Sequence, residues 1–370
     1  MSNKLRVAVI FGGRSGEHEV SLVSAASVMN AIDKNRYEIV PIGITKEGKW
    51  LVSGDPMRVL TGQESIVGKP SSAIVVDPTQ PALIALEPNG TTRRNQRIDV
   101  VIPILHGPYG EDGTVQGLLE LAGVPYVGAG VLASAVGMDK GLMKTVFAQS
   151  GIPIVDFLTV LKRDWLKDAG SITNRIQERL GFPCFVKPAC LGSSVGISKV
   201  RRREEMGAAM QLAGEFDRKI VVEKAAIDVR EIECSVLGND DPIVSVPGEI
   251  VPCNEFYDYR AKYVDEGSQL IIPADLPEAT DKIVRHWARE AYKAIDCAGM
   301  ARVDFFVSRD GKQVLVNEIN TIPGFTSISM YPKLWEATGV TYAELIDRLI
   351  ELALERHSEK SRIRTSYDAD

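Results

Sequence analysis

The sequence predicts an α/β protein made of three modules, the first of which contains a parallel β-sheet. Apolar runs of strand length alternate with helical patterns in the first third of the chain, which is typical of βαβ units covered on both faces. The chain has 370 residues, enough for two or three domains with substantial cores. From about residue 139 the pattern changes to strands, charged helices and a hairpin.

The first module is expected over residues 1–138. Apolar runs predict buried strands at 6–13, 37–44 and 98–107, and helical patterns lie at about 20–32 and 114–122. Between about 48 and 97 the pattern is weak and rich in Pro, Gly and polar residues, which predicts an irregular insertion.

The second module is expected over 139–230 and the third over 231–370. For the second, the patterns predict helices at 139–150 and 202–213 and strands at 182–188 and 219–225. For the third, they predict strands at 231–238 and 243–251, a long loop at 252–272, a helix at 277–296, a hairpin at 302–320 and a helix at 342–355. Asp310–Gly311 is the hairpin's turn signal, and the tail from 358 is expected to fray.

Composition argues against several classes of protein. The net charge is −6, and the only basic block that stands out, RRR at 201–203, is interpreted as a solvated helix start, so nucleic acid is not expected as a partner. Five cysteines without a CxxC spacing argue against a disulfide framework or a zinc site. The sequence shows neither a signal peptide nor an apolar run of about 18 residues. We therefore expect a cytoplasmic protein without a membrane partner.

Two polar residues interrupt the apolar strand LVNEIN at 315–320. Glu318 and Asn320 lie two positions apart and therefore share one face, where they are costly unless something pairs with them. Arg302 and Asp304 share a face of the preceding strand in the same way. Asp304 and Glu318 lie on a common face only if the hairpin has an odd-length turn or a bulge at 309–312. Two carboxylates and an amide oxygen would then suit Mg²⁺ beside substrate phosphates, whereas the alternative is a structural ion pair of Arg302 with one carboxylate.

Cationic residues that could hold phosphates lie in other segments. FVKPACLGSSVG at 185–196 supplies Lys187 at a strand end, followed by a Gly/Ser loop with exposed N–H groups, but it fits neither the P-loop nor the Rossmann fingerprint. Lys140 in MDK and the pair Glu223–Lys224 are further candidates. Each of these charges, taken alone, is more often a solvated surface group.

In combination, these segments resemble the ATP-grasp superfamily and, within it, the D-alanine–D-alanine ligases, along essentially the whole chain. The matching motifs are FGGRSGEHEVSL (11–22), LHGPYGEDGTVQG (105–117), MDK (138–140), FVKPACLGSSVG (185–196), VVEK (221–224), REIE (230–233), YDYRAKY (257–263), RVDFF (302–306) and NEINTIPGFTSISMYP (317–332). Their number and order make a chance match improbable.

The resemblance implies a three-domain ATP-grasp architecture, with an N-terminal parallel-sheet domain and α+β domains after it. It implies that ATP phosphorylates one D-alanine, and that the amine of a second attacks the acyl phosphate through a tetrahedral intermediate to give D-alanyl-D-alanine for peptidoglycan precursors. Two Mg²⁺ ions, replaceable by Mn²⁺, are implied as cofactors, and K⁺ activates some relatives. Relatives are commonly homodimers, so a homodimer is expected.

The resemblance also implies roles at the nucleotide end of the site. The metal ligands would be Asp304, Glu318 and Asn320. Phosphate oxygens would be contacted by Lys140, Lys187 and Lys262. Adenine would be held by Glu223, Lys224 and the Ala226 backbone, and the ribose by Glu231.

At the amino-acid end, the resemblance implies that Glu17 binds the first ammonium and that His106 lies near the first carboxylate. Arg302 and the Gly324 N–H would form the oxyanion site, and Ser329 with the Met330 N–H would hold the second carboxylate. A hydrogen-bonded triad of Glu17, Ser193 and Tyr263 would close the site and exclude water.

Three alternatives and one departure from the family pattern remain. An ester-forming ligase that makes D-alanyl-D-lactate is disfavoured by Tyr263, because such relatives usually carry a different residue there. Another carboxylate–amine ligase is disfavoured by Glu17, His106 and Ser329, and a purely regulatory nucleotide-binding protein by Arg302. In PACLG, Cys190 stands where relatives frequently have Arg or another polar residue, and we expect it to be a neutral lid residue.

Overall fold

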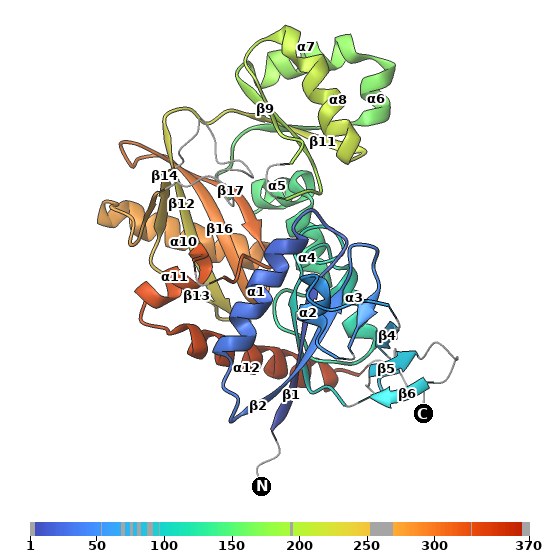
Figure 1. The fold of residues 1–370 in the computed structure, drawn as a ribbon. Helices are drawn as coiled ribbons and strands as arrows, with labels where there is room; N and C mark the ends of the chain where they lie inside the picture. The colour runs from blue at the N-terminus through green and yellow to red at the C-terminus, as the bar shows by residue number, and fades with distance from the viewer. Residues whose placement is uncertain are drawn as a thin grey trace, which may run out of the picture.

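The computed structural model describes residues 4–52, 54–67, 71–74, 77–79, 83–86, 92–95, 97–192, 195–251, 269–326 and 328–364. Figure 1 shows a large sheet in the middle of the molecule, a smaller unit with β9 and β11 above it, and the N-terminal strands and helices below. Within the described ranges, no helix combines the length and the apolar character needed to cross a membrane.

The N-terminal sheet is parallel at its centre, as predicted. β1 (Leu5–Gly12) pairs in parallel with β2 (Tyr37–Ile44) on one side and β7 (Val100–Ile104) on the other, and β3 (Trp50–Leu51) adds an antiparallel edge. The helices of this part are α1 (His18–Ala31), α3 (Thr114–Leu121) and α4 (Val131–Met138). The carboxyl ends of β1 and β7 thus meet at one edge of the sheet, where the loops carrying Glu17 and His106 begin.

The prediction of an irregular insertion between 48 and 97 is wrong for part of that segment. α2 (Pro56–Leu60) is a short helix, and β4 (Ser71–Ile74), β5 (Leu83–Leu86) and β6 (Thr92–Asn95) form an antiparallel three-stranded sheet. Each strand has four residues, too few for a clear alternation of polar and apolar positions.

The central sheet is antiparallel and has the order β10-β9-β11-β8. Its strands are β8 (Phe157–Leu161), β9 (Cys184–Pro188), β10 (Ser198–Val200) and β11 (Lys219–Lys224). The helices are α5 (Lys140–Gln149), α6 (Lys162–Lys167), α7 (Ala169–Arg179) and α8 (Met206–Phe216), the last preceded by a 3₁₀ turn at Arg203–Glu205. The expected strands and helices at 139–150, 182–188, 202–213 and 219–225 are confirmed, but β8 and α7 were not predicted.

The third sheet runs β15-β14-β12-β16-β17, with β13 paired to β12, and every pairing in it is antiparallel. Its strands are β12 (Val229–Gly238), β13 (Ile243–Val244), β14 (Gly248–Val251), β15 (Gln269–Ile271), β16 (Gly299–Ser308) and β17 (Val314–Asn320). α10 (Glu278–Ala294) packs against this sheet, and α11 (Met330–Ala337) and α12 (Tyr342–Ser361) follow it. The Asp310–Gly311 turn is present, with Gly311 at φ +71°.

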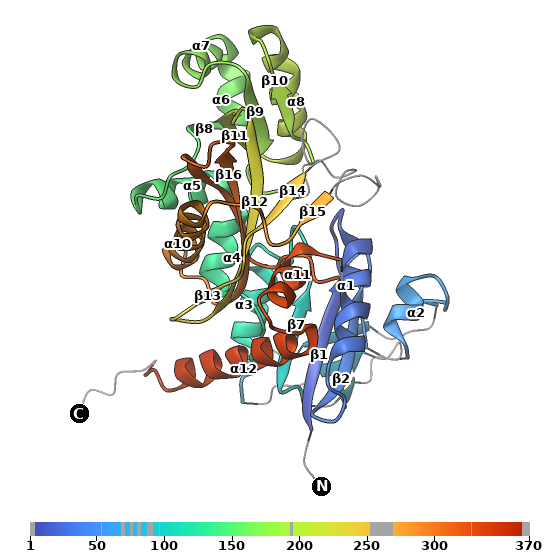
Figure 2. The same cartoon turned by 90° about the vertical axis from the view of Figure 1, so that its left-hand side faces the viewer.

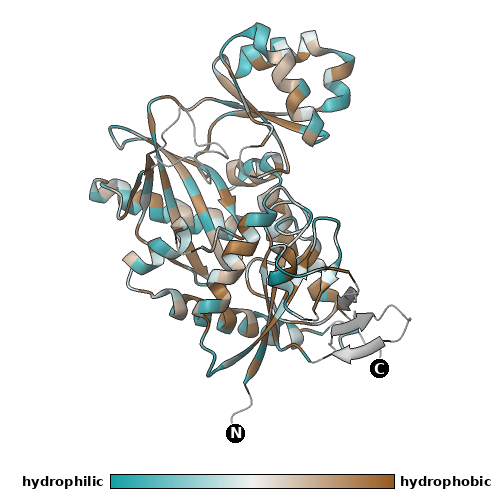
Figure 3. Cartoon of the chain, in the orientation of Figure 1, coloured by the Kyte–Doolittle hydropathy of each residue, from teal (hydrophilic) through white to brown (hydrophobic). Residues whose placement is uncertain are grey.

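The C-terminal helix returns to the N-terminal sheet. Leu345, Ile346 and Leu349 of α12 belong to the same buried cluster as Val7 and Phe11 of β1, and Figure 2 shows α12 crossing the lower part of the molecule and reaching β1. In Figure 3, hydrophobic positions follow these buried strands, whereas hydrophilic positions are frequent on exposed helices. The helix continues to Ser361. The prediction that the chain frays from residue 358 is therefore wrong for residues 358–361. The third module thus contributes α12 to the core of the first module. The module boundaries at 138 and 230 stay predictions.

Candidate active site

One cavity of about 1140 Å³ lies between the three large sheets and is lined by all the predicted site residues that the structure describes. These are Glu17, His106, Lys140, Lys187, Glu223, Lys224, Ala226, Glu231, Arg302, Asp304, Glu318, Asn320, Gly324, Ser329 and Met330. The other three predicted residues, Ser193, Lys262 and Tyr263, lie outside the described residues. Segments far apart in the chain therefore meet at one site.

The register of the β16–β17 hairpin places Asp304 opposite Glu318 and Arg302 opposite Asn320. The predicted common face is therefore confirmed. The irregularity that produces it is not at 309–312, as expected, but between Asp304 and Phe305, because Phe305 pairs with Val316 and leaves Asn317 as an extra residue in β17. β-Bulges are common next to active sites, where they change the direction in which side chains point.

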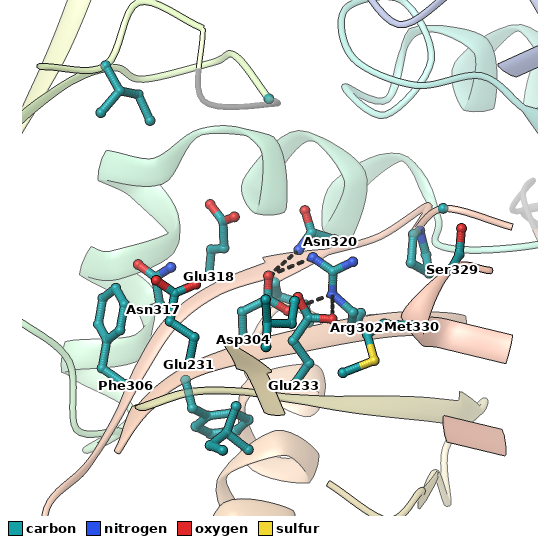
Figure 4. A pocket seen from close by; sticks show the side chains of 18 of the residues that line it. Glu231, Glu233, Arg302, Asp304, Phe306, Asn317, Glu318, Asn320, Ser329 and Met330 are labelled. Carbon is teal, nitrogen blue, oxygen red and sulfur yellow. Dashed lines mark hydrogen bonds and ion pairs between the residues drawn. The ribbon is translucent and has the colours of Figure 1, made fainter. Parts of the chain in front are cut away.

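Arg302 is partly buried and lies between two carboxylates, as Figure 4 shows. Its Nε and Nη2 each lie 2.7 Å from an oxygen of Asp304, and its Nε lies 3.0 Å from Glu233 Oε2. Burial lowers the pKa of Arg302, but Asp304 and Glu233 outweigh it and raise that pKa well above its usual value. The structural ion pair considered as an alternative is thus formed, and its partner Glu233 was not predicted. The REIE motif, with two acids two positions apart, was the signal for it.

The donor set on this face fits a hard divalent cation. Asp304 and Glu318 lie directly opposite each other on adjacent strands, where like charges repel unless cations lie beside them. Asn320 donates from Nδ2 to Asp304 Oδ2 at 3.0 Å, which leaves its amide oxygen as a ligand. In the described ranges, no group of three or more His, Cys, Asp or Glu side chains could hold a metal alone. A cation here would therefore take further ligands from a substrate, as Mg²⁺ commonly does.

Three lysines gather beside two carboxylates, Glu223 and Glu318, next to this face. Lys187 Nζ lies 2.7 Å from Glu223 Oε2, and Lys144 Nζ lies 3.4 Å from Glu223 Oε1. Lys140 Nζ donates to the Leu191 carbonyl at 3.0 Å and lies 3.5 Å from Glu318 Oε2. Burial raises the pKa of Glu223, but Lys144 and Lys187 outweigh it and hold that pKa below its usual value. This cluster carries more cations than anions, which suits a polyphosphate.

Lys224 and Ala226 lie where β11 ends. The Lys224 side chain is exposed, while its backbone N–H donates to the Asp156 carbonyl at 2.9 Å. Glu223 is 2% exposed as a residue, and its carboxylate already contacts two lysines. Glu231, on β12, lines the same cavity.

Glu17 lies in the turn between β1 and α1. Gly12 and Gly13 have φ angles of +90° and +97°, and a Cβ on Gly12 would lie 2.2 Å from the Ile44 carbonyl oxygen, so glycine is required there. The Glu17 N–H donates to Ser15 Oγ at 3.1 Å. His18 Nδ1 lies 2.9 Å from the Gly13 carbonyl. These contacts hold the turn that presents Glu17 to the cavity.

His106 follows β7 and pairs with an acid that the sequence analysis did not single out. Its Nδ1 lies 3.4 Å from Glu111 Oε1, and its Nε2 is buried without a hydrogen-bond partner within the described part of the chain. Burial lowers the pKa of His106, but the Glu111 carboxylate outweighs it and raises that pKa. The acid in HGPYGED, five residues after the histidine, was the available signal.

Ser329 and Met330 begin α11, which was not predicted. Ser329 is the N-cap residue, and its Oγ accepts the Thr326 N–H at 3.1 Å. A Cβ on Gly324 would lie 3.0 Å from that Oγ, so the bare backbone permits the close approach of the two segments. The N-terminus of a helix favours a carboxylate, which agrees with the role implied for Ser329 and the Met330 N–H.

Two family models match the chain. The one described as D-ala D-ala ligase N-terminus matches residues 6–129, and the one described as D-ala D-ala ligase C-terminus matches residues 146–351. Among curated proteins, the chain is 52% identical over 359 residues to a D-alanine–D-alanine ligase of Heliobacterium modesticaldum, covering 97% of each chain. It is 50% identical over 368 residues to that of Geobacillus thermodenitrificans, covering 99% of this chain and all of the relative.

Solved structures are similar over nearly the whole chain. A D-alanine–D-alanine ligase from Coxiella burnetii matches with a TM-score of 0.84 and 40% identity, covering 98% of this chain and 97% of the other. A D-Ala:D-Ser ligase from Enterococcus faecalis matches with a TM-score of 0.84 and 37% identity, covering 95% of this chain and all of the other.

Proposed function

Because this chain belongs to the D-alanine–D-alanine ligase family, we propose that its central cavity is where ATP activates one D-alanine for attack by a second. The chain is an ATP-dependent ligase of two D-alanine molecules and serves the synthesis of peptidoglycan precursors. One observation carries the assignment of the site. Asp304, Glu318, Asn320 and Arg302 share one face of the β16–β17 hairpin and line the cavity.

At the nucleotide end, Lys140 and Lys187 neutralise the phosphates of ATP. This role is supported by their burial and by the excess of cations over anions around Glu223. Glu223, Lys224 and the Ala226 backbone hold the adenine ring, and Glu231 binds the ribose hydroxyls. Phosphoryl transfer depends chiefly on positioning and charge neutralisation, which these groups provide.

Asp304, Glu318 and Asn320 are the side chains that would hold Mg²⁺, or Mn²⁺ in its place. Two such ions would neutralise the charge that the phosphates carry. With a cation held by Asp304, Glu233 would remain as a counter-charge for the Arg302 guanidinium. Arg302 is thereby left positioned to donate toward the reacting carboxylate.

At the amino-acid end, Glu17 binds the ammonium of the first D-alanine and His106 lies beside its carboxylate, with Glu111 orienting the imidazole. Arg302 and the Gly324 N–H stabilise the oxyanion that develops when the second amine attacks. The Ser329 hydroxyl and the Met330 N–H, at the start of α11, bind the second carboxylate.

Several parts of the proposal rest on the family pattern alone. Lys262 would contact phosphate, and Glu17, Ser193 and Tyr263 would form the triad that closes the site. We also propose a cytoplasmic homodimer whose activity K⁺ could stimulate, with modules at 1–138, 139–230 and 231–370.

The test is phosphate release from Mg-ATP with and without D-alanine. We expect strong stimulation by D-alanine and D-alanyl-D-alanine as the product. Because one similar structure is a D-Ala:D-Ser ligase, D-serine and D-lactate are added as competing acceptors, and dipeptide formation from D-alanine is expected to exceed both. Absence of stimulation by D-alanine would refute the ligase assignment.

A further inference from the structure

Lys144 is a buried lysine that the proposed reaction does not use. It lies on α5, four residues after Lys140 and therefore on the same helix face, and it is 1% exposed. A buried ammonium is costly unless charged or polar partners surround it. Two partners do so. Lys144 Nζ donates to the Asn317 carbonyl at 3.2 Å and lies 3.4 Å from Glu223 Oε1.

Asn317 is the extra residue of the bulge in β17. It has no opposite residue on β16, because the pairing passes from Phe305–Val316 directly to Asp304–Glu318. β17 is also the edge strand of its sheet. A bulged residue at an edge needs its backbone groups satisfied from outside the ladder. Lys144 provides a charged donor for this carbonyl.

The bulge decides which face of β17 points into the cavity. If the pairing of Phe305 with Val316 continued without it, Asn317 would lie opposite Asp304, and Ile319 opposite Arg302. A shift of one residue moves every side chain to the other face. Glu318 would then point into the core beside Val303, and the carboxylate pair would be lost.

Lys144 also joins two parts of the site. α5 contacts β11 of the central sheet and β17 of the third sheet. Through Glu223, which it shares with Lys187, Lys144 connects the nucleotide end of the cavity to the strand that carries Glu318. The neighbouring Val316 N–H is likewise bound from outside the hairpin, by the Pro153 carbonyl at 2.7 Å.

We propose that Lys144 is a positioning residue: its ammonium holds the Asn317 bulge and so keeps Glu318 and Asn320 on the face of Asp304. The proposal rests on the ligase function proposed above. Lys144 acts through β17 and does not itself touch substrate.

The test is the variant Lys144→Met, which keeps an unbranched apolar chain that is one atom shorter and removes the ammonium group. We expect the Mg²⁺ concentration for half-maximal phosphate release to rise about tenfold, as for other supports of metal ligands. Amide hydrogen exchange at 317–320 should also become about tenfold faster, because a charged hydrogen bond to the backbone is lost.

Lys162→Met is the matched control. Lys162 Nζ likewise donates to a backbone carbonyl, that of Gly214, at 2.7 Å, but it does not line the cavity. This variant should leave the Mg²⁺ requirement and the exchange of 317–320 unchanged. An unchanged Mg²⁺ requirement together with unchanged exchange in Lys144→Met would overturn the proposal.

Lys144→Met could fail to fold, because it removes one of the two cations that neutralise the buried Glu223 carboxylate. A second variant tests the proposal in that event. The double variant Lys144→Met/Glu223→Gln removes that charge, and it is compared with Glu223→Gln alone. The same tenfold changes are expected between these two proteins, and their absence refutes the role of Lys144. A wild-type enzyme without D-alanine-stimulated release would instead refute the ligase function, and hydrogen exchange in β17 would still decide on Lys144.

Discussion

Arg302 and Asp304 form a two-point ion pair, with Nε–Oδ1 and Nη2–Oδ2 distances of 2.7 Å each. The pair joins a proposed oxyanion donor to a proposed metal ligand two residues away on the same strand face. A substitution of either residue therefore removes contacts of the other.

Arg302→Lys should lower kcat by about a hundredfold or more, because a lysine cannot reproduce the planar two-point contact and one oxyanion donor is lost. ATP binding, measured by calorimetry with a non-hydrolysable analogue, should change little. Arg285→Lys is the control, since Arg285 forms a similar two-point pair with Asp281 on α10, away from the cavity. Turnover by the Arg302→Lys variant that stays within about threefold of the wild type would contradict the role of Arg302.

Cys190→Ser should leave turnover within about twofold of the wild type, because a mainly buried, protonated thiol is a poor nucleophile. Burial, with Asp139 and Asp217 nearby, raises the pKa of Cys190 to about 12. Alkylation by iodoacetamide at neutral pH, followed by mass spectrometry, should modify this cysteine slowly. Modification as fast as that of free cysteine would show that the thiol is exposed and ionised.

Asp139→Asn should destabilise the protein by about 1 kcal/mol at neutral pH, because the ion pair with Lys219 is lost while the amide oxygen still caps α5. Burial raises the pKa of Asp139, but Lys219 outweighs it and holds that pKa below its usual value. The ion-pair contribution is therefore present above the ordinary aspartate pKa of about 3.9 and is lost as the pH falls through the depressed folded-state value. The difference in urea midpoint should shrink on acidification.

The control for that experiment is Asp168→Asn. Asp168 caps α7 by accepting the Ser171 N–H at 2.9 Å, without an ion pair to any residue in the described part of the chain. Its variant should show only a small midpoint difference at neutral pH, because the amide oxygen can still accept the Ser171 N–H. Equal pH dependence in both variants would contradict the contribution assigned to Lys219.

Arg356→Ala should destabilise the protein by about 2–3 kcal/mol, because two charged hydrogen bonds and a cation–π contact are lost together. Arg356 lies on α12, where it donates to the carbonyls of Tyr126 and Gly128 and lies 4.6 Å from the Tyr126 ring centroid. Arg348→Ala on the same helix removes only a surface pair with Glu344 and should cost about 0.5 kcal/mol or less. Equal losses in thermal unfolding would show that α12 is not fastened through Arg356.

Local patterns predicted most of the long elements. The apolar run of β1, the helical pattern of α10 and the Asp310–Gly311 turn each depend on neighbours in sequence, and each is present. The sequence analysis missed α7 because most of its residues are polar, and β8 because it has only five residues. It missed α11 because that helix begins in an irregular segment. α12 extends past its predicted end, where Arg356 donates to the carbonyls of Tyr126 and Gly128 and Lys360 pairs with Glu120, all distant in sequence.

By itself, the sequence determined which residue types could form the site, because the strand period places Arg302 with Asp304, and Glu318 with Asn320, whatever surrounds them. Only the tertiary structure decided that the two pairs face each other, because one extra residue, Asn317, sets the phase of β17. The tertiary structure also brings Glu111 to His106, Glu233 to Arg302 and Lys144 to the Asn317 carbonyl. Contacts between segments distant in sequence depend on how the sheets pack, and no local periodicity encodes them.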